Sequence, residues 1–115
     1  MLSLPPSVRI FVCLEPADMR RSFDGLSAMV SHVLAKDPQS GHLFVFRNRR
    51  GDRMKILYWD RDGFALWYKR LEAGTFRFGA PSDAAQVEWT PAELALVLEG
   101  IDVRDARRQK RYRKV

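Results

Sequence analysis

The sequence predicts an α+β fold in a single domain, and three observations support this prediction. The chain has 115 residues, which is enough for one hydrophobic core and too short for two. Residues 41–78 contain short extended runs that are separated by turn residues. One stretch with helical periodicity precedes this region and another follows it. We therefore expect an antiparallel β meander of about four to six strands, packed with a helix from the N-terminal half and a C-terminal helix.

The N-terminal third predicts one strand and one helix. Residues 8–14 alternate so that one face of a strand is better buried than the other. In residues 19–34 apolar side chains recur at intervals of three and four, as in a helix with one apolar stripe. Asp18 is the expected N-cap, and the helix should end before the Asp37-Pro38 pair. Gly25 inside this helix indicates close packing or a tight approach by another element.

The middle of the chain predicts the meander. The expected strands are His42 to Arg47, Arg53 to Trp59, Phe64 to Leu71 and Thr75 to Phe78. Asn48 to Asp52 and Asp60 to Gly63 are expected as turns, because Asp-Gly between extended runs is a strong hairpin signal. Nine aromatic residues lie in this region and should form one side of the core: Phe44, Phe46, Tyr58, Trp59, Phe64, Trp67, Tyr68, Phe76 and Phe78.

The region after the meander predicts an edge strand followed by a helix. Residues 87–89 suit a short edge strand. Thr90 as N-cap, Pro91 at the first helical position and Glu93 in a capping box then mark the start of a helix. Its apolar stripe is formed by Leu94, Val97, Leu98 and Ile101. Gly100 stands where a C-terminal cap is expected.

The positive charge of the chain is confined to its C-terminal end. The net charge is +6, and residues 104–115 hold seven Lys or Arg against one Asp, so residues 1–103 are neutral. We expect a folded domain over residues 1–103 and a flexible basic tail over residues 104–115. The candidate nucleic-acid-binding residues of the tail are Arg104, Arg107, Arg108, Lys110, Arg111, Arg113 and Lys114.

The sequence lacks the residue patterns of common catalytic and metal sites. Asp60 and Asp62 have the spacing that opens a calcium loop, but the further ligands of such a loop do not follow. His32 and His42 have no Cys or acidic neighbour at metal-ligand spacing, and Cys13 fits a small buried residue better than a nucleophile. We therefore predict a protein that is not an enzyme and that has no metal site and no cofactor.

The apolar content of the chain is distributed in short stretches. Ile10 to Leu14 and Leu94 to Leu98 are the longest unbroken apolar runs, and a membrane span needs about 20 residues. Arg9 interrupts the only candidate signal segment. Cys13 is the single cysteine, which fits a reducing compartment. We expect a cytoplasmic protein without membrane contact.

A second group of cations surrounds the first turn of the meander. The candidate nucleic-acid-binding residues here are Arg47, Arg49, Arg50, Arg53 and Lys55, opposed only by Asp52. A two-stranded ribbon with cations on its loop suits a DNA groove or a phosphate backbone, and nearby aromatic rings suit stacking on unpaired bases. The alternative is a solvated hairpin whose aromatic residues pack into the core. The sequence leaves both interpretations of the loop arginines open.

Four segments of the chain match one known family in order and spacing. They are Asp18 to Leu26, Ser40 to Arg49, Lys55 to Gly63 and Trp67 to Gly74. Together they resemble the accessory protein TnpB, the Orf2-like product of the second open reading frame in the bacterial insertion sequence sixty-six family. This family is unrelated to the RNA-guided nuclease of the same name. The resemblance covers about residues 8–101 and does not extend to the basic tail.

The resemblance implies a role in transposition beside a separate transposase that carries the catalytic carboxylates. It assigns no role to any single residue. One hypothesis is a non-catalytic accessory protein that binds DNA at the element ends or helps to assemble the transposase–DNA complex. The alternative is a protein-interaction module that binds the transposase or a companion accessory protein without direct DNA contact. The sequence leaves homo-oligomerisation open.

Overall fold

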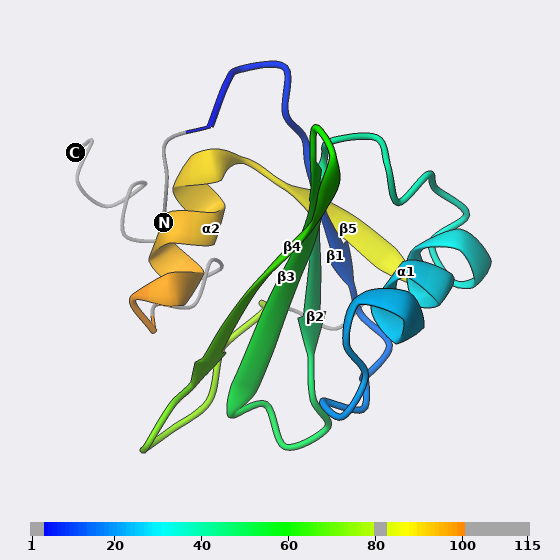
Figure 1. The fold of residues 1–115 in the computed structure, drawn as a ribbon. Helices are drawn as coiled ribbons and strands as arrows, with labels where there is room; N and C mark the ends of the chain where they lie inside the picture. The colour runs from blue at the N-terminus through cyan, green and yellow to red at the C-terminus, as the bar shows by residue number, and fades with distance from the viewer. Residues whose placement is uncertain (1–3, 80–82, 101–115) are drawn as a thin grey trace, which may run out of the picture.

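The computed structural model describes residues 4–79 and 83–100. These residues form a five-stranded mixed sheet with one helix on each side (Figure 1). The elements in chain order are β1 (Ile10–Cys13), α1 (Phe23–His32), β2 (Leu43–Arg47), β3 (Arg53–Asp60), β4 (Gly63–Arg70), β5 (Gln86–Trp89) and α2 (Pro91–Leu98). The strand order is β4-β3-β2-β1-β5, and the α+β prediction is confirmed.

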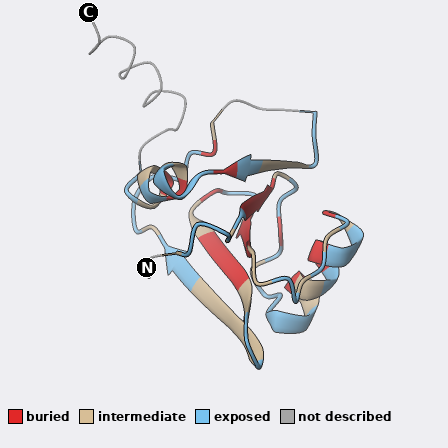
Figure 2. Ribbon diagram, turned by 90° about the horizontal axis from the view of Figure 1, so that it is seen from above, coloured by how far each residue is buried: buried red, intermediate tan, exposed pale blue. Residues whose placement is uncertain are grey.

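The sheet is buried on both faces, so the protein has two hydrophobic clusters. The cluster on the α2 side contains Ile10, Val12, Leu43, Val45, Met54, Ile56, Phe76, Phe78, Trp89, Leu94 and Val97. The cluster on the α1 side contains Phe11, Cys13, Ala17, Leu26, Met29, Val30, Leu34, Phe44, Phe46 and Leu57. All four residues of β1 are therefore buried, whereas the sequence predicted one better-buried face. Figure 2 shows this burial along the inner strands, with exposed residues on the outer sides of the helices.

The sheet contains one parallel pair that the sequence did not predict. β1 runs parallel to β2, with Ile10 opposite Leu43 and Val12 opposite Val45. α1 connects these two strands, and such a crossover allows neighbouring strands to run in the same direction. β2, β3 and β4 form an antiparallel meander, and β5 adds antiparallel to β1 at the other edge.

The prediction of a fourth meander strand over Thr75 to Phe78 is wrong. No strand is present in this described segment. Its main chain is instead bound to the β2–β3 turn, since Phe76 N donates to Gly51 O at 2.8 Å. The side chains of Phe76 and Phe78 are buried in the cluster on the α2 side. β4 therefore remains an edge strand of the sheet.

The predicted N-cap of the first helix is also wrong. α1 begins at Phe23, and Ser22 occupies the N-cap position without a side-chain capping bond among the described residues. Asp18 lies in the preceding loop, where its Oδ1 accepts from Arg20 N at 2.9 Å. An Asp side chain that binds the backbone two residues later forms a turn rather than a helix start, and both are common for this residue type.

The predicted start and end of the second helix are confirmed. Thr90 Oγ1 accepts from Glu93 N and Glu93 Oε1 accepts from Thr90 N, each at 3.1 Å, so the capping box is complete. Gly100 follows the helix with a φ of +82°, as expected for a glycine cap. Neither helix in the described part of the chain has the length and hydrophobicity that a membrane span requires.

Candidate nucleic-acid interface

An open groove of about 730 Å³ lies between the loop before α1 and the β2–β3 turn. Five arginines line it: Arg20, Arg21, Arg49, Arg50 and Arg53. Its carboxylates are Glu15, Asp18 and Asp52, so the formal charge of the lining is positive. We call this feature the arginine groove. Guanidinium groups provide several N–H donors in a fixed plane, which suits phosphate oxygens.

The wall formed by the β2–β3 turn is held by Asn48. Its Oδ1 accepts from Gly51 N at 2.9 Å and from Arg53 N at 3.0 Å, and its Nδ2 donates to Asp52 Oδ1 at 2.7 Å. The last bond, together with the nearby Arg50 and Arg53, lowers the pKa of Asp52. These bonds fix the turn while Arg49 and Arg50 at its tip stay exposed.

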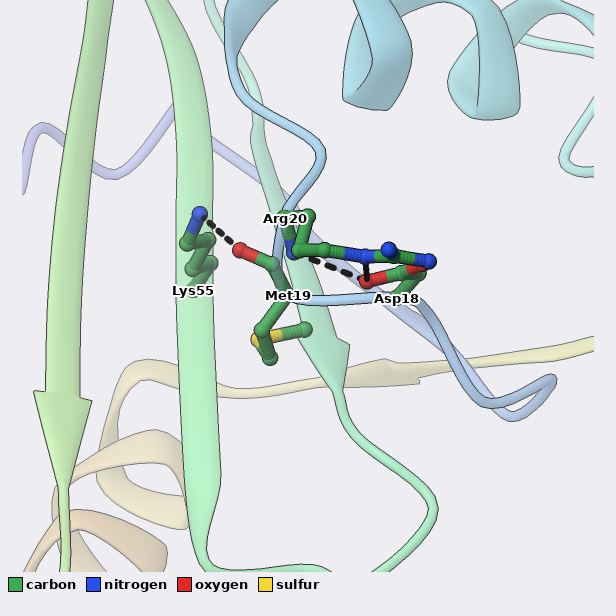
Figure 3. Close-up of polar contacts among 4 residues, drawn as sticks. All are labelled: Asp18, Met19, Arg20 and Lys55. Carbon is green, nitrogen blue, oxygen red and sulfur yellow. Dashed lines mark hydrogen bonds and ion pairs between the residues drawn. The ribbon is translucent and has the colours of Figure 1, made fainter.

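The opposite wall is held by a buried cation. Lys55 on β3 is only 5% exposed, and its Nζ donates to Met19 O and to Arg21 O, each at 2.8 Å. Figure 3 shows the Lys55 side chain reaching from the strand to the Met19 carbonyl. The same Nζ lies 4.6 Å from the centre of the Tyr68 ring. Lys55, a predicted DNA-binding residue, thus faces the interior and positions the loop main chain.

Arg20 in this loop is already paired. Its guanidinium donates to Asp18 Oδ2 at 2.7 Å, although the Arg20 side chain is 91% exposed. These hydrogen bonds lower the pKa of Asp18 to about 2. The pair neutralises one charge of the groove. It lies in the loop whose Met19 carbonyl accepts from Lys55 (Figure 3).

Arg21 runs across the first turn of α1, and Gly25 makes room for it. A Cβ atom on Gly25 would lie 3.0 Å from Arg21 Cβ and 3.1 Å from Arg21 Cγ. Contacts this short force a neighbour to move. The tight approach that the glycine indicated in the sequence is therefore made by a side chain that lines the arginine groove.

The hairpin cations predicted from the sequence divide into two groups. Arg47 is half-buried, its NH1 donates to Phe76 O at 2.8 Å, and its guanidinium carbon lies 4.1 Å from the centre of the Phe78 ring. Burial lowers the pKa of Arg47. Arg49, Arg50 and Arg53 line the groove instead. Arg47 and Lys55 thus hold chain segments together, and three of the five predicted residues remain at the groove.

Arg21, Arg49 and Arg50 have guanidinium groups available for a ligand. None of the three forms a guanidinium hydrogen bond or an ion pair within the described residues. The helical periodicity of residues 19–34 predicts Arg20 and Arg21 in the first turn of a helix, so this pattern does not identify them as candidate binding residues. Two consecutive arginines between a strand and a helix, inside a family motif, were the signal that could have identified them.

The predicted residues of the basic tail lie outside the described part of the chain. They are Arg104, Arg107, Arg108, Lys110, Arg111, Arg113 and Lys114.

Among the residues that the structure does describe, no group of three or more His, Cys, Asp or Glu side chains is placed to hold a metal ion. Cys13 is 1% exposed, and burial raises the pKa of its thiol. The five arginines of the arginine groove suit the binding of an anion.

The comparison with known proteins confirms the family resemblance, and the match extends beyond residue 101 to residue 108. The family profile described as IS66 Orf2 like protein matches residues 8–108. The uncharacterized protein y4jC of Sinorhizobium fredii is 40% identical over 102 residues, covering 89% of this chain and 86% of that protein. The uncharacterized protein y4hO of the same organism is 36% identical over 115 residues, covering 100% and 99%. No solved structure matches the chain significantly.

Proposed function

Because the chain belongs to the IS66 Orf2-like family, and is thus an accessory protein of an insertion sequence, we propose that it binds DNA through the arginine groove during transposition. The observation that carries this proposal is the position of Arg21, Arg49 and Arg50. All three line one groove, and their guanidinium groups form no hydrogen bond or ion pair with any described residue.

The walls of the groove support the proposal because they are fixed before a ligand arrives. Asn48 holds the turn that carries Arg49 and Arg50, and Lys55 holds the main chain beside Arg20 and Arg21. A preformed site loses less conformational entropy on binding than a mobile one. Phosphate contacts made in this way position a protein on DNA and carry no sequence information by themselves.

The basic tail has a separate role in this proposal. Residues 104–115 carry the whole net charge of +6, so they would attract DNA at long range and without regard to sequence. The groove would then fix the orientation of the bound protein. The protein itself performs no strand cleavage or joining in this proposal, and a separate transposase of the same element is the expected partner that does.

The protein-interaction alternative rests on one different observation. β4 is an edge of the sheet, and no described strand pairs with its outer side. An edge strand offers a row of main-chain N–H and C=O groups to a strand of another protein. This arrangement suits a module that binds the transposase or a companion accessory protein without touching DNA. Such an interface would depend weakly on salt.

A matched pair of double variants tests the proposal. Arg49→Ala/Arg50→Ala removes two charges from the groove, and Arg61→Ala/Arg77→Ala removes two exposed charges elsewhere. Fluorescence polarisation would measure affinity for labelled element-end and scrambled duplexes at two salt concentrations. We expect the groove variant to bind about tenfold more weakly and to flatten the salt dependence by about two phosphate contacts. The control variant, which has the same net charge, should change affinity by less than about twofold.

Equal losses in the two variants would show that net charge alone drives binding, and the groove proposal would fail. Truncation of residues 104–115 gives the comparison for long-range attraction, and it should flatten the salt dependence more than the groove variant does. If neither change affects DNA affinity, a pull-down with the transposase of the element at high salt becomes the deciding measurement for the interaction-module alternative.

A further inference from the structure

Tyr68 is an exposed aromatic residue beside the arginine groove. It lies on β4 opposite Lys55 of β3, and it is 46% exposed. Phe23 is the only other large hydrophobic residue that is exposed in the described part of the chain. The other aromatic residues of the meander are buried or half-buried, as the sequence predicted for this part of the core. The exposure of Tyr68 therefore requires a separate explanation.

Two contacts connect Tyr68 to the groove. Arg53, which lines the groove, donates from NH1 to the Tyr68 hydroxyl at 3.2 Å. Lys55 lies 4.6 Å from the centre of the Tyr68 ring, and the same ammonium holds the carbonyl of Arg21 in the opposite wall. The ring thus contacts Arg53 and Lys55 of β3. Arg53 lines the groove, and Lys55 holds the wall that carries Arg21.

These contacts also fix the ring. The hydroxyl is held by Arg53, and the buried ammonium of Lys55 lies over the ring. Because these two contacts already restrict the ring, it loses little conformational entropy when a flat ligand stacks on its exposed surface. Aromatic side chains beside a positively charged groove are the arrangement that binds single-stranded nucleic acid, where each base stacks and each phosphate meets a cation.

Resting on the proposed function, we propose that the arginine groove and Tyr68 together bind an unpaired segment of a DNA strand. In this arrangement Arg49, Arg50 and Arg53 contact phosphates, and one unpaired base stacks on the Tyr68 ring. A duplex does not offer this contact, because its base faces are covered by neighbouring bases. An apolar protein surface fits less well, because covering Tyr68 would also remove Arg53 from water without a partner charge.

Binding of matched oligonucleotides to Tyr68 variants tests the inference. The probes are a labelled DNA strand of about 12 nucleotides, its duplex and an RNA strand of the same sequence, measured by fluorescence polarisation at one salt concentration. The variants are Tyr68→Ala, Tyr68→Leu, which keeps an apolar side chain in the strand, and Tyr68→Phe, which keeps the ring. Phe23→Ala removes the other exposed aromatic residue and serves as the control.

We expect Tyr68→Ala and Tyr68→Leu to weaken binding of the DNA strand by about tenfold and binding of the duplex by less than about twofold. Tyr68→Phe keeps the stacking ring and loses only the bond from Arg53, so it should weaken binding of the DNA strand by less than about threefold, and Phe23→Ala should keep the affinity of the unmodified protein. Equal weakening of strand and duplex, or no weakening of either, would overturn the inference. Binding of the RNA strand about tenfold tighter than the DNA strand would overturn the choice of DNA.

The failure of this inference can be told apart from the failure of the proposed function. If Arg49→Ala/Arg50→Ala leaves the affinities for strand and duplex unchanged, the groove does not bind DNA and both proposals fail. If that variant weakens both probes while Tyr68→Leu weakens neither, the groove binds DNA and only the stacking of an unpaired base is excluded.

Discussion

Lys55 Nζ and the carbonyl oxygen of Met19 are 2.8 Å apart, and this hydrogen bond joins β3 to the loop before α1. The same ammonium donates to the carbonyl oxygen of Arg21 at 2.8 Å. Main-chain carbonyls and an aromatic ring thus surround a cation that is 5% exposed. Lys55, which the sequence predicts as a DNA-binding residue, thus sets the position of one wall of the arginine groove.

Replacing this cation should destabilise the fold. Lys55→Met keeps the length of the side chain but leaves two carbonyls without their donor, so we expect the free energy of unfolding to fall by about 2 kcal/mol. Lys69→Met on β4 is the control, because Lys69 is exposed and donates to one carbonyl, that of Leu98, at 3.4 Å, so it should change this free energy by less than about 0.5 kcal/mol. Urea denaturation of both variants measures the difference. Equal midpoints would mean that the loop is held by other contacts.

Substitution of Arg47 should affect stability and substitution of Arg49 should affect DNA affinity, although both arginines belong to the same hairpin. Arg47→Leu removes the bond to Phe76 O and the contact with the Phe78 ring, so it should lower the free energy of unfolding by about 2 kcal/mol. Arg49→Ala should leave stability within about 0.5 kcal/mol and weaken DNA binding. Denaturation and polarisation measured on both variants check this. The reverse pattern would place Arg47 at the DNA interface.

The features that the sequence predicted correctly depend on residues close together in the chain. In the capping box, the side chains of Thr90 and Glu93 each accept a hydrogen bond from the main-chain N–H of the other residue. Both bonds lie within one turn, so four residues are enough to identify the helix start. The turn between β3 and β4 is equally local, because Asp60 pairs with Gly63. The turn residues between the extended runs located β2, β3 and β4 for the same reason.

Contacts with distant partners account for much of what the sequence did not reveal. Arg47 binds a carbonyl 29 residues away, and Lys55 binds one 36 residues away, so the sequence does not show that these two cations hold chain segments together. Phe76 has the β propensity of a strand residue, but its main-chain N–H donates to the carbonyl oxygen of Gly51 in the β2–β3 turn instead of to a neighbouring strand. Asp18 has two local uses, as a cap and as a turn residue, and the sequence does not choose between them.

The capping box of α2 gives a stability prediction. Thr90→Ala removes Oγ1, the acceptor for Glu93 N, but keeps the main-chain N that donates to Glu93 Oε1, so the free energy of unfolding should fall by about 1 kcal/mol. Thr75→Ala, an exposed threonine outside the helices, is the matched control. Chemical denaturation monitored by tryptophan fluorescence provides the measurement. An unchanged midpoint for Thr90→Ala would show that the cap contributes nothing to the fold.

Acid should weaken the loop that carries Arg20. The folded pKa of Asp18 is about 2, below its ordinary value of 3.8, because Arg20 donates hydrogen bonds to the ionised carboxylate. A lowered folded pKa means that the contribution to stability is complete above about pH 4 and is lost as the pH falls towards 2. Asp18→Asn should remove this part of the acid dependence, which denaturation midpoints at a series of pH values would measure.

The same substitution should strengthen DNA binding at neutral pH. Asp18→Asn keeps an oxygen for the bond from Arg20 N but removes the negative charge that pairs with the Arg20 guanidinium. We expect affinity for a duplex to rise about threefold and its salt dependence to steepen by about one phosphate contact. Asp37→Asn is the matched control, since Asp37 Oδ1 accepts from Gln39 N at 2.9 Å in a similar turn and Asp37 does not line the groove. If Asp37→Asn raises affinity as much as Asp18→Asn, the gain comes from net charge, and Arg20 has no part in the DNA interface.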